Sequence, residues 1–186
     1  TPLTAISGNA SILLSDSEHL DINARKQMYE DIYDDSAWLH NLVENLLAIT
    51  KIEEGRIELK TQPQLVEEIV SEAMQHISRK RDEHIITITH ENDLLFAQCD
   101  AKLIVQTIIN LIDNAIKYTP AGSHIWITTR QEQVSAVFTV ADDGPGISDQ
   151  EKKQIFQMFY TGANTVADSR RSLGLGLSLC RSIVTA

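Results

Sequence analysis

The sequence predicts an α+β fold in which a two-helix hairpin precedes an α/β sandwich. Apolar residues recur at three- and four-residue steps through residues 3–49, which is the helical period. Beyond Gly55, short runs that alternate between apolar and polar residues indicate strands separated by helical segments. Gly55 itself is a typical helix stop. We therefore expect a helical-hairpin domain over residues 1–54 and a second domain over residues 55–186.

Composition excludes several classes of protein. The chain has 186 residues and a formal net charge of -10, without the basic stripe that phosphate contacts need, so no nucleic-acid partner is expected. Cys99 and Cys180 are isolated and show no metal-ligand spacing. No apolar run approaches the ~20 residues of a membrane span, and no signal peptide is evident. These features predict a soluble cytoplasmic chain.

The hairpin carries two apolar seams. They consist of Leu3, Ile6, Ala10 and Leu13, followed by Met28, Ile32, Leu39, Leu42, Leu46 and Ile49. A single hairpin with seams this narrow cannot bury its own apolar side chains. A second copy of the chain would bury them by completing a four-helix bundle. We expect a homodimer. The alternative is that both seams pack on the C-terminal part of the same chain.

Strands and helices then alternate. Ile57 and Leu59 predict a short strand, and Leu65 to Ile77 a helix. Further strands are expected at 86–88, 94–96, 125–127 and 134–140, with a hairpin turn at 131–133. Helices would cover one face of this mixed sheet.

The most informative helix is predicted for residues 101–118, with Asp100 as its N-cap. A helical wheel gives it a core-facing arc of Ile104, Ile108, Leu111, Ala115 and Ile116. Asn110, Asn114 and Lys117 lie on the opposite side, within about 60° of one another. An ordinary solvated face is the simplest interpretation. However, an Asn oxygen can ligate Mg²⁺ and a Lys ammonium can bind phosphate.

Two glycine-rich segments follow. In the first, Asp142 ends a strand, and Gly144 and Gly146 permit close approaches and unusual backbone angles. A plain surface turn is the alternative. Residues 148–151 form a capping box that opens a short helix through Phe156. Phe156 and Phe159 could be ordinary core residues. A polar segment, residues 161–172, then leads to Gly174 and Gly176, at the start of an apolar helix where unpaired N–H groups favour phosphate.

In this order the segments resemble the four nucleotide-binding boxes of the sensor histidine kinases. Residues 110–118 resemble the N box, 142–146 the G1 box, 155–160 the F box and 173–177 the G2 box. The resemblance implies a fold of the histidine-kinase/gyrase/Hsp90-like ATPase type, with ATP and Mg²⁺ as cofactors. Residues 160–162 and 169–177 are most similar to the potassium-responsive Kdp group of this family.

The resemblance also implies a role for individual residues. Asp142 would accept a hydrogen bond from the adenine amino group, Asn114 would coordinate Mg²⁺, and Asn110 and Lys117 would contact the phosphates or the metal. The implied ATP site comprises Asn110, Asn114, Lys117, Tyr118, Asp142, Gly144, Gly146, Ile147, Phe159, Arg170, Arg171, Leu173, Gly174, Leu175, Gly176 and Leu177. Thr161 stands where many relatives carry an Arg, and Arg170 or Arg171 would substitute for it.

The implied activity is transfer of the γ-phosphoryl of ATP to a His on the hairpin and then to an Asp of a response regulator. Residues 1–4 resemble the end of the family's H box, in which the acceptor His stands four positions before Thr1. We therefore expect a fragment, truncated at both ends, of a protein anchored in the inner membrane. Thr1 would belong to the catalytic region, and the fragment would not phosphorylate itself.

Two other functions are compatible with the pattern. An ATP hydrolase of the same nucleotide-binding fold would carry a Glu as the base for water where Asn110 stands. A catalytically silent nucleotide-binding dimerisation module would keep the fold but not the chemistry.

Overall fold

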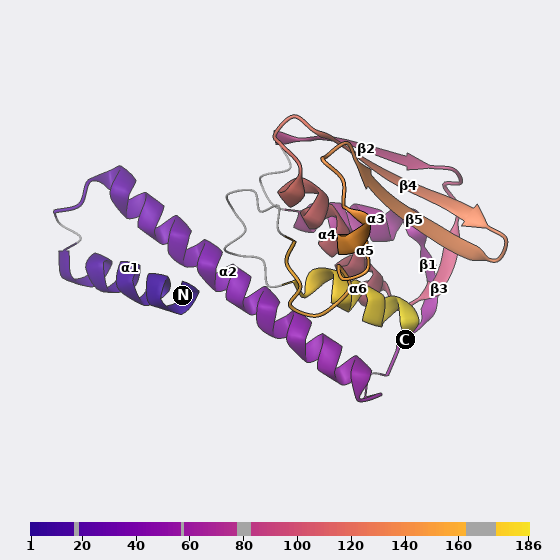
Figure 1. Ribbon diagram of the computed structural model, residues 1–186, viewed down its shortest axis with the longest axis horizontal. Helices are drawn as coiled ribbons and strands as arrows, with labels where there is room; N and C mark the ends of the chain where they lie inside the picture. Colours follow the sequence, from indigo (N-terminus) through magenta and orange to yellow (C-terminus); the bar gives the residue numbers. More distant parts are fainter. Residues whose placement is uncertain (17–18, 57, 78–82, 163–173) are drawn as a thin grey trace. The chain divides into compact units, whose positions relative to one another are not determined.

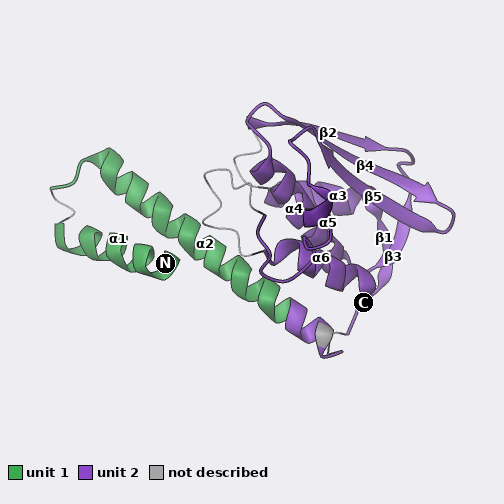
Figure 2. Ribbon diagram, viewed as in Figure 1, with its two compact units in different colours: residues 1–48 green, residues 49–186 purple. Residues whose placement is uncertain are grey.

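The computed structural model describes residues 1–16, 19–56, 58–77, 83–162 and 174–186. The chain forms two compact units, Thr1–Ala48 and Ile49–Ala186 (Figure 2). The division lies inside a helix, shortly before the boundary predicted at residues 54 and 55. None of the described helices is long and apolar enough to cross a membrane.

The first unit is the predicted helical hairpin. Its helices are α1, Pro2–Asp16, and α2, Ile22–Glu53, which continues into the second unit. The end of α2 confirms the predicted glycine stop, because Gly55 has φ +63. The Gly55 N–H donates to the Ile52 carbonyl at 3.0 Å and the Arg56 N–H to the Lys51 carbonyl at 2.9 Å. This pair of hydrogen bonds is the Schellman motif, which satisfies carbonyls at a helix C-terminus.

The second unit contains two small sheets. Strand β1, Gln62–Leu65, pairs antiparallel with β3, Phe96–Cys99. The central strand β4, His124–Glu132, lies parallel to β2, Ile85–His90, and antiparallel to β5, Ser135–Asp142. Helices α3, Val66–His76, α4, Ala101–Tyr118, and α6, Gly176–Thr185, lie on one side of the three-stranded sheet (Figure 1). A short helix α5, Asp149–Lys152, completes the described elements.

Several predicted strand limits are wrong. The strand expected around Leu59 starts only at Gln62, and Ile57 lies outside the described residues. β1 accommodates Pro63 because it has a neighbour on one side only in this two-stranded sheet. Leu94 precedes β3 and is exposed. The β4–β5 hairpin is confirmed, but its turn contains Val134, which is 98% exposed.

Helix α4 runs through the centre of the core. Ile108, Ala115 and Ile116 are buried as predicted, whereas Leu111 is half-buried and Ile112 is completely buried in its place. The buried arc is rotated because α4 packs on α3 and α6 as well as on the sheet. Its partners are the apolar side chains Ile69, Val70, Ala73, Ile125 and Ile127.

Asp100 occupies the N-cap position of α4 but does not cap it. Its backbone is extended, and no side-chain capping hydrogen bond is present. The carboxylate instead accepts the Lys60 N–H at 3.0 Å, so Asp100 ties the segment before β1 to the start of α4.

Candidate functional site

The exposed side of α4 presents a group of polar side chains. Asn110, Asn114 and Lys117 are all half-buried. Asp113 lies on the same side by helical geometry, although the sequence analysis did not single it out. Surrounding protein raises the pKa of the Asp113 carboxyl to about 6 by removing water, even though part of the residue remains exposed, and Lys117 opposes the rise. Two amides, a carboxyl and an ammonium therefore share one surface.

Asn110 joins this surface to the start of α6. A Cβ atom placed on Gly176, the first residue of α6, would lie 3.7 Å from the Asn110 Oδ1 and Cγ atoms. Burial raises the pKa of the Cys180 thiol to about 11, and this thiol, on α6, donates to the Thr107 carbonyl of α4 at 3.7 Å. The Asn110 Nδ2 atom is buried and has no hydrogen-bond partner among the described residues. A donor in this state favours an oxygen-rich ligand, because an unsatisfied buried amide is costly.

The loop after β5 carries two adjacent carboxylates with different contacts. The Asp142 Oδ1 atom accepts the Gly144 N–H at 3.0 Å, and Gly146 adopts φ +74. The Asp143 Oδ1 atom accepts the His124 N–H at 2.9 Å, and the Asp143 N–H donates to the His124 carbonyl at 3.2 Å. Asp143 therefore anchors the loop to β4, whereas Asp142 organises the loop itself.

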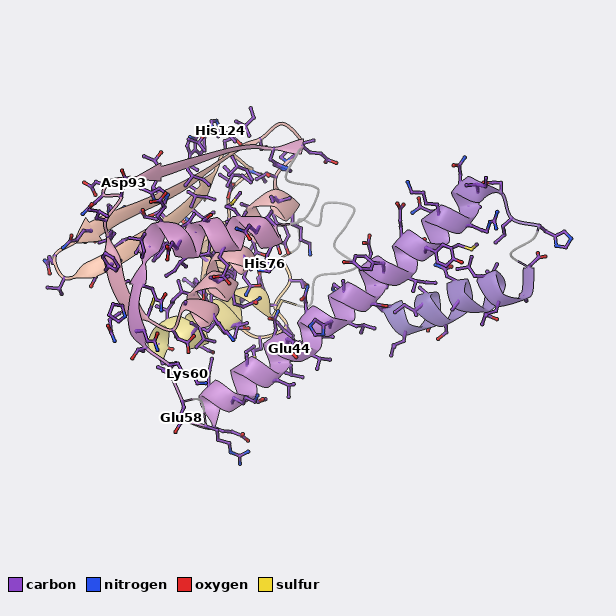
Figure 3. The ribbon with its side chains drawn as sticks, turned by 180° about the vertical axis from the view of Figure 1, so that it is seen from behind. Glu44, Glu58, Lys60, His76, Asp93 and His124 are labelled. Carbon is purple, nitrogen blue, oxygen red and sulfur yellow. The ribbon has the colours of Figure 1, made fainter. Side chains whose placement is uncertain are left out.

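His124 in turn is fixed on the sheet (Figure 3). Its ring stacks on Trp126 with centroids 4.2 Å apart, and its Nε2 atom lies 2.7 Å from the Thr87 hydroxyl. The strand end that receives Asp143 is thus held by contacts within β2 and β4.

Residues 148–160 form the next part of the site. The capping box of Ser148 and Glu151 is confirmed, but the helix it opens ends at Lys152 rather than at Phe156. Phe156 and Phe159 are both exposed, so the alternative that they are ordinary core residues is wrong. Phe159 has φ +65, and its N–H donates to the Gly174 carbonyl at 3.1 Å.

Gly174 lies directly against this segment. It has φ +64, and a Cβ placed on it would lie 2.2 Å from the Tyr160 carbonyl oxygen. The backbones of Phe159 and Tyr160 therefore lie directly against the backbone of Gly174. Arg170, Arg171 and Leu173 lie outside the described residues.

The remaining predicted residues divide by burial. Ile147 is exposed, Leu177 is half-buried, and Leu175 is buried, so the Leu175 side chain packs in the core. The Lys117 Nζ atom lies 5.5 Å from the centre of the Tyr118 ring. Thr1 belongs to the helical unit, where its hydroxyl accepts the Thr4 N–H at 3.3 Å.

One residue of this site was missed by the sequence analysis. Thr119 follows α4, is buried, and donates its hydroxyl to the Ala115 carbonyl at 2.7 Å. A Cβ atom on Gly144 would lie 2.6 Å from the Thr119 methyl carbon. The only signal in the sequence is a Thr directly after a helix that ends in Lys117 and Tyr118, which does not reveal its distant partner.

The donor set fits a nucleotide with Mg²⁺. The site offers a buried amide N–H, an amide oxygen, an ammonium and the N–H groups of a helix start, which suit phosphate and a hard cation. Among the described residues, no group of three or more His, Cys, Asp or Glu could hold a metal.

Comparison with known proteins places both units in families. Residues 99–186 match the model "Histidine kinase-, DNA gyrase B-, and HSP90-like ATPase", and residues 1–55 match "His Kinase A (phospho-acceptor) domain". The catalytic domain of histidine kinase ThkA is similar in structure, with a TM-score of 0.60 and 28% identity over 67% of this chain and 80% of that one. Histidine kinase AdeS of Acinetobacter baumannii shares the fold, with a TM-score of 0.71 and 22% identity over 100% of this chain and 84% of that chain.

The chain therefore belongs to the sensor histidine kinases, as the four boxes predicted. Within this class it is 42% identical to Sensor protein KdpD of Clostridium acetobutylicum, over 100% of this chain but 21% of that protein. The resemblance to the Kdp group is confirmed. The chain is also 28% identical to the histidine-protein kinase/phosphatase MprB of Mycobacterium avium, over 99% of this chain and 35% of that protein. It thus spans only a minor part of these relatives.

Proposed function

We propose that this chain is a kinase core that binds ATP·Mg²⁺ and transfers the γ-phosphoryl to the acceptor His of a helical hairpin, a His that would stand four positions before the equivalent of Thr1, and that the phosphoryl group then passes to an Asp of a response regulator. The observation that carries the proposal is the meeting of the α4 polar surface with the start of α6, where the Asn110 Nδ2 atom has no partner among the described residues. The same unit holds the Asp142 loop.

Each residue has a distinct task in this proposal. The Asp142 carboxylate accepts a hydrogen bond from the adenine amino group, and the Asn110 Nδ2 donates to a phosphate oxygen. Asn114 supplies an amide oxygen to Mg²⁺, and Lys117 places positive charge at the phosphates. Bound Mg²⁺ neutralises charge on the phosphates during transfer. Phosphoryl transfer depends mainly on such positioning and charge neutralisation.

Hydrolysis as the main activity is disfavoured by Asn110. A hydrolase needs a general base within reach of the attacking water, and an amide cannot accept that proton. Asp113 lies on the same side of α4, but it is one residue before the proposed metal ligand rather than a full turn away. The silent-module alternative keeps the nucleotide site and differs only in phosphotransfer.

The partners follow from the helical unit and from a relative. Histidine kinase ThkA was solved in complex with response regulator protein TrrA, and that kinase is 26% identical with a TM-score of 0.64, over 98% of this chain and 50% of that chain. We propose that a receiver domain binds the hairpin, that the parent protein is membrane-anchored, and that the chain dimerises through Ile32, Leu39, Leu42 and Leu46. Light scattering that shows a folded monomer at high concentration would contradict the dimer.

The test of the kinase proposal is phosphotransfer from [γ-³²P]ATP. We expect acid-labile label on an added helical hairpin whose sequence includes a His four positions before the equivalent of Thr1. We expect none on this chain, whose hairpin histidines, His19 and His40, lack the family's acceptor context. Label on His40 would overturn the acceptor assignment. Bound ATP with no label on the added hairpin would favour the silent module.

A further inference from the structure

We propose that Thr119 is a positioning residue for Asp142, and that its methyl group, acting through Gly144, sets the selectivity of the site for adenine. The inference deepens the proposed function and rests on it, because it assumes that Asp142 recognises the adenine amino group. Thr119 itself is buried and would not touch the nucleotide.

The Thr119 side chain has a fixed orientation. Its hydroxyl donates to the Ala115 carbonyl at 2.7 Å, one turn back in α4. A Thr side chain has few rotamers, so this hydrogen bond also determines where the methyl group points. The methyl group is thereby directed by the same helix that carries Asn110, Asn114 and Lys117.

The methyl group and the Asp142 carboxylate occupy the same side of Gly144. A Cβ placed there would lie 2.6 Å from Thr119 Cγ2 and 2.8 Å from Asp142 Oδ1. Gly144 also donates its N–H to that same Oδ1 atom at 3.0 Å. The absence of a side chain at Gly144 therefore lets the methyl group and the carboxylate approach one backbone position together.

This arrangement couples two parts of the site that are separate in sequence. The loop is held on one side by Asp143 at the His124 backbone and on the other by the Thr119 methyl group. If the methyl group is removed, Gly144 can shift toward α4 and take the Asp142 carboxylate with it. The hydrogen bond to adenine depends on the direction of that carboxylate, so its geometry would be the first property lost.

Two substitutions separate the methyl group from the hydroxyl. Thr119→Ser keeps the hydrogen bond to Ala115 and removes the methyl group, whereas Thr119→Val keeps the methyl group and removes the hydrogen bond. The readout is the ratio of dissociation constants for ATP and inosine triphosphate, which replaces the adenine amino group with a carbonyl oxygen. We expect Thr119→Ser to reduce this selectivity by roughly three- to tenfold, and Thr119→Val to reduce it by less than about twofold.

A second measurement tests the contact itself. Gly144→Ala introduces the Cβ that would collide with the Thr119 methyl carbon. Its loss of selectivity should be smaller in a Thr119→Ser background, because one of the two collisions is then removed, and this non-additivity marks direct coupling. Additive effects would overturn the inference.

The remaining outcomes are also decisive. Equal loss of selectivity in Thr119→Ser and Thr119→Val, or no loss in either, overturns the inference. If Thr119→Ser does not fold, Thr119→Ala replaces it: a loss of selectivity in Thr119→Ala that Thr119→Val does not share supports the inference, and equal selectivity in these two variants overturns it. Asp142→Ala distinguishes the failure of the proposed function from the failure of this inference. If Asp142→Ala keeps wild-type selectivity, the adenine assignment fails. If Asp142→Ala loses selectivity and the Thr119 variants do not, only the inference about Thr119 fails.

Discussion

Gly144 and Gly174 lie in two loops of the proposed nucleotide site, and neither position leaves room for a side chain, for different reasons. At Gly144 the obstructing atoms belong to the side chains of Thr119 and Asp142, and the backbone angle is not positive. At Gly174 the obstructing atoms are the backbone N, C and O of Tyr160, and φ is +64. A side chain can rotate away, whereas a paired backbone cannot. The loop at Gly144 can therefore adjust to a new side chain, whereas the backbone at Gly174 is held in place.

Gly174→Ala should produce the largest effect. The left-handed angle alone costs roughly 1–2 kcal/mol, and collision with the Tyr160 backbone adds to it, for a total on the order of 2–4 kcal/mol. We expect a clear fall in melting temperature and loss of the hydrogen bond between Phe159 and Gly174. Thermal unfolding followed by circular dichroism measures the first, and amide hydrogen exchange at Phe159 measures the second.

Gly122→Ala is the matched control for this substitution. Gly122 has φ +87, but no atom lies within 4 Å of a Cβ placed on it. Its cost should be limited to the backbone term, roughly 1–2 kcal/mol. Equal destabilisation by the two substitutions would show that the collision with Tyr160 adds nothing to the loss of stability. The backbone at Gly174 would then not be held in place by Tyr160.

Asp142→Ala comes next and acts on ATP binding. A charge-assisted hydrogen bond is worth ~1.5–3 kcal/mol, so affinity should fall roughly ten- to a hundredfold. Asp143→Ala is the control, because Asp143 contacts the His124 backbone instead of the loop interior. It should lower stability more than it lowers affinity. Calorimetric titration with ATP checks both, and unchanged affinity in Asp142→Ala would refute the adenine assignment.

The features that the sequence predicted correctly are those whose residues lie close together along the chain. The limits of α4, the capping box of Ser148 and Glu151, the helix stop at Gly55 and the β4–β5 hairpin were all correct. Each depends on residues within a few positions of one another.

The incorrect or missing assignments depended on distant partners. Asp100 was expected to cap its own helix, but its carboxylate binds the backbone of Lys60, forty positions away. Thr119 was overlooked because its partner is Gly144 in another loop. Strand β1 starts later than expected because its register is set by β3, which lies beyond α3 and β2 in the chain. The polar face of α4 and the two glycine-rich segments were found from the residues themselves, whereas the role of each residue came from the resemblance of four boxes and remains a prediction.

Asn114→Ala should have a smaller effect that depends on the metal. If Asn114 supplies an oxygen to Mg²⁺, affinity for ATP should fall several-fold, roughly 1 kcal/mol, when Mg²⁺ is present and change little when EDTA removes it. Titrations with and without Mg²⁺ measure this difference. Equal losses in both conditions would indicate a contact that does not involve the metal.

Asp113→Asn should have the smallest effect, and it should depend on pH. The pKa of Asp113 is raised to about 6 in the folded protein, above its ordinary value of 3.8, so the folded state holds the proton more tightly than the unfolded state. The ionised carboxylate therefore destabilises the fold, and this cost develops as the pH rises from about 4 to about 6. Asn mimics the neutral carboxyl, so the variant should match the wild type below pH 4 and be more stable above pH 6. Solvent at the exposed part of Asp113 will make the gain smaller than the full shift implies. Urea unfolding at pH 4 and pH 8 measures it, and an Asp113→Asn variant that is less stable at pH 8 would contradict the prediction, because it would show that the ionised carboxylate stabilises the fold.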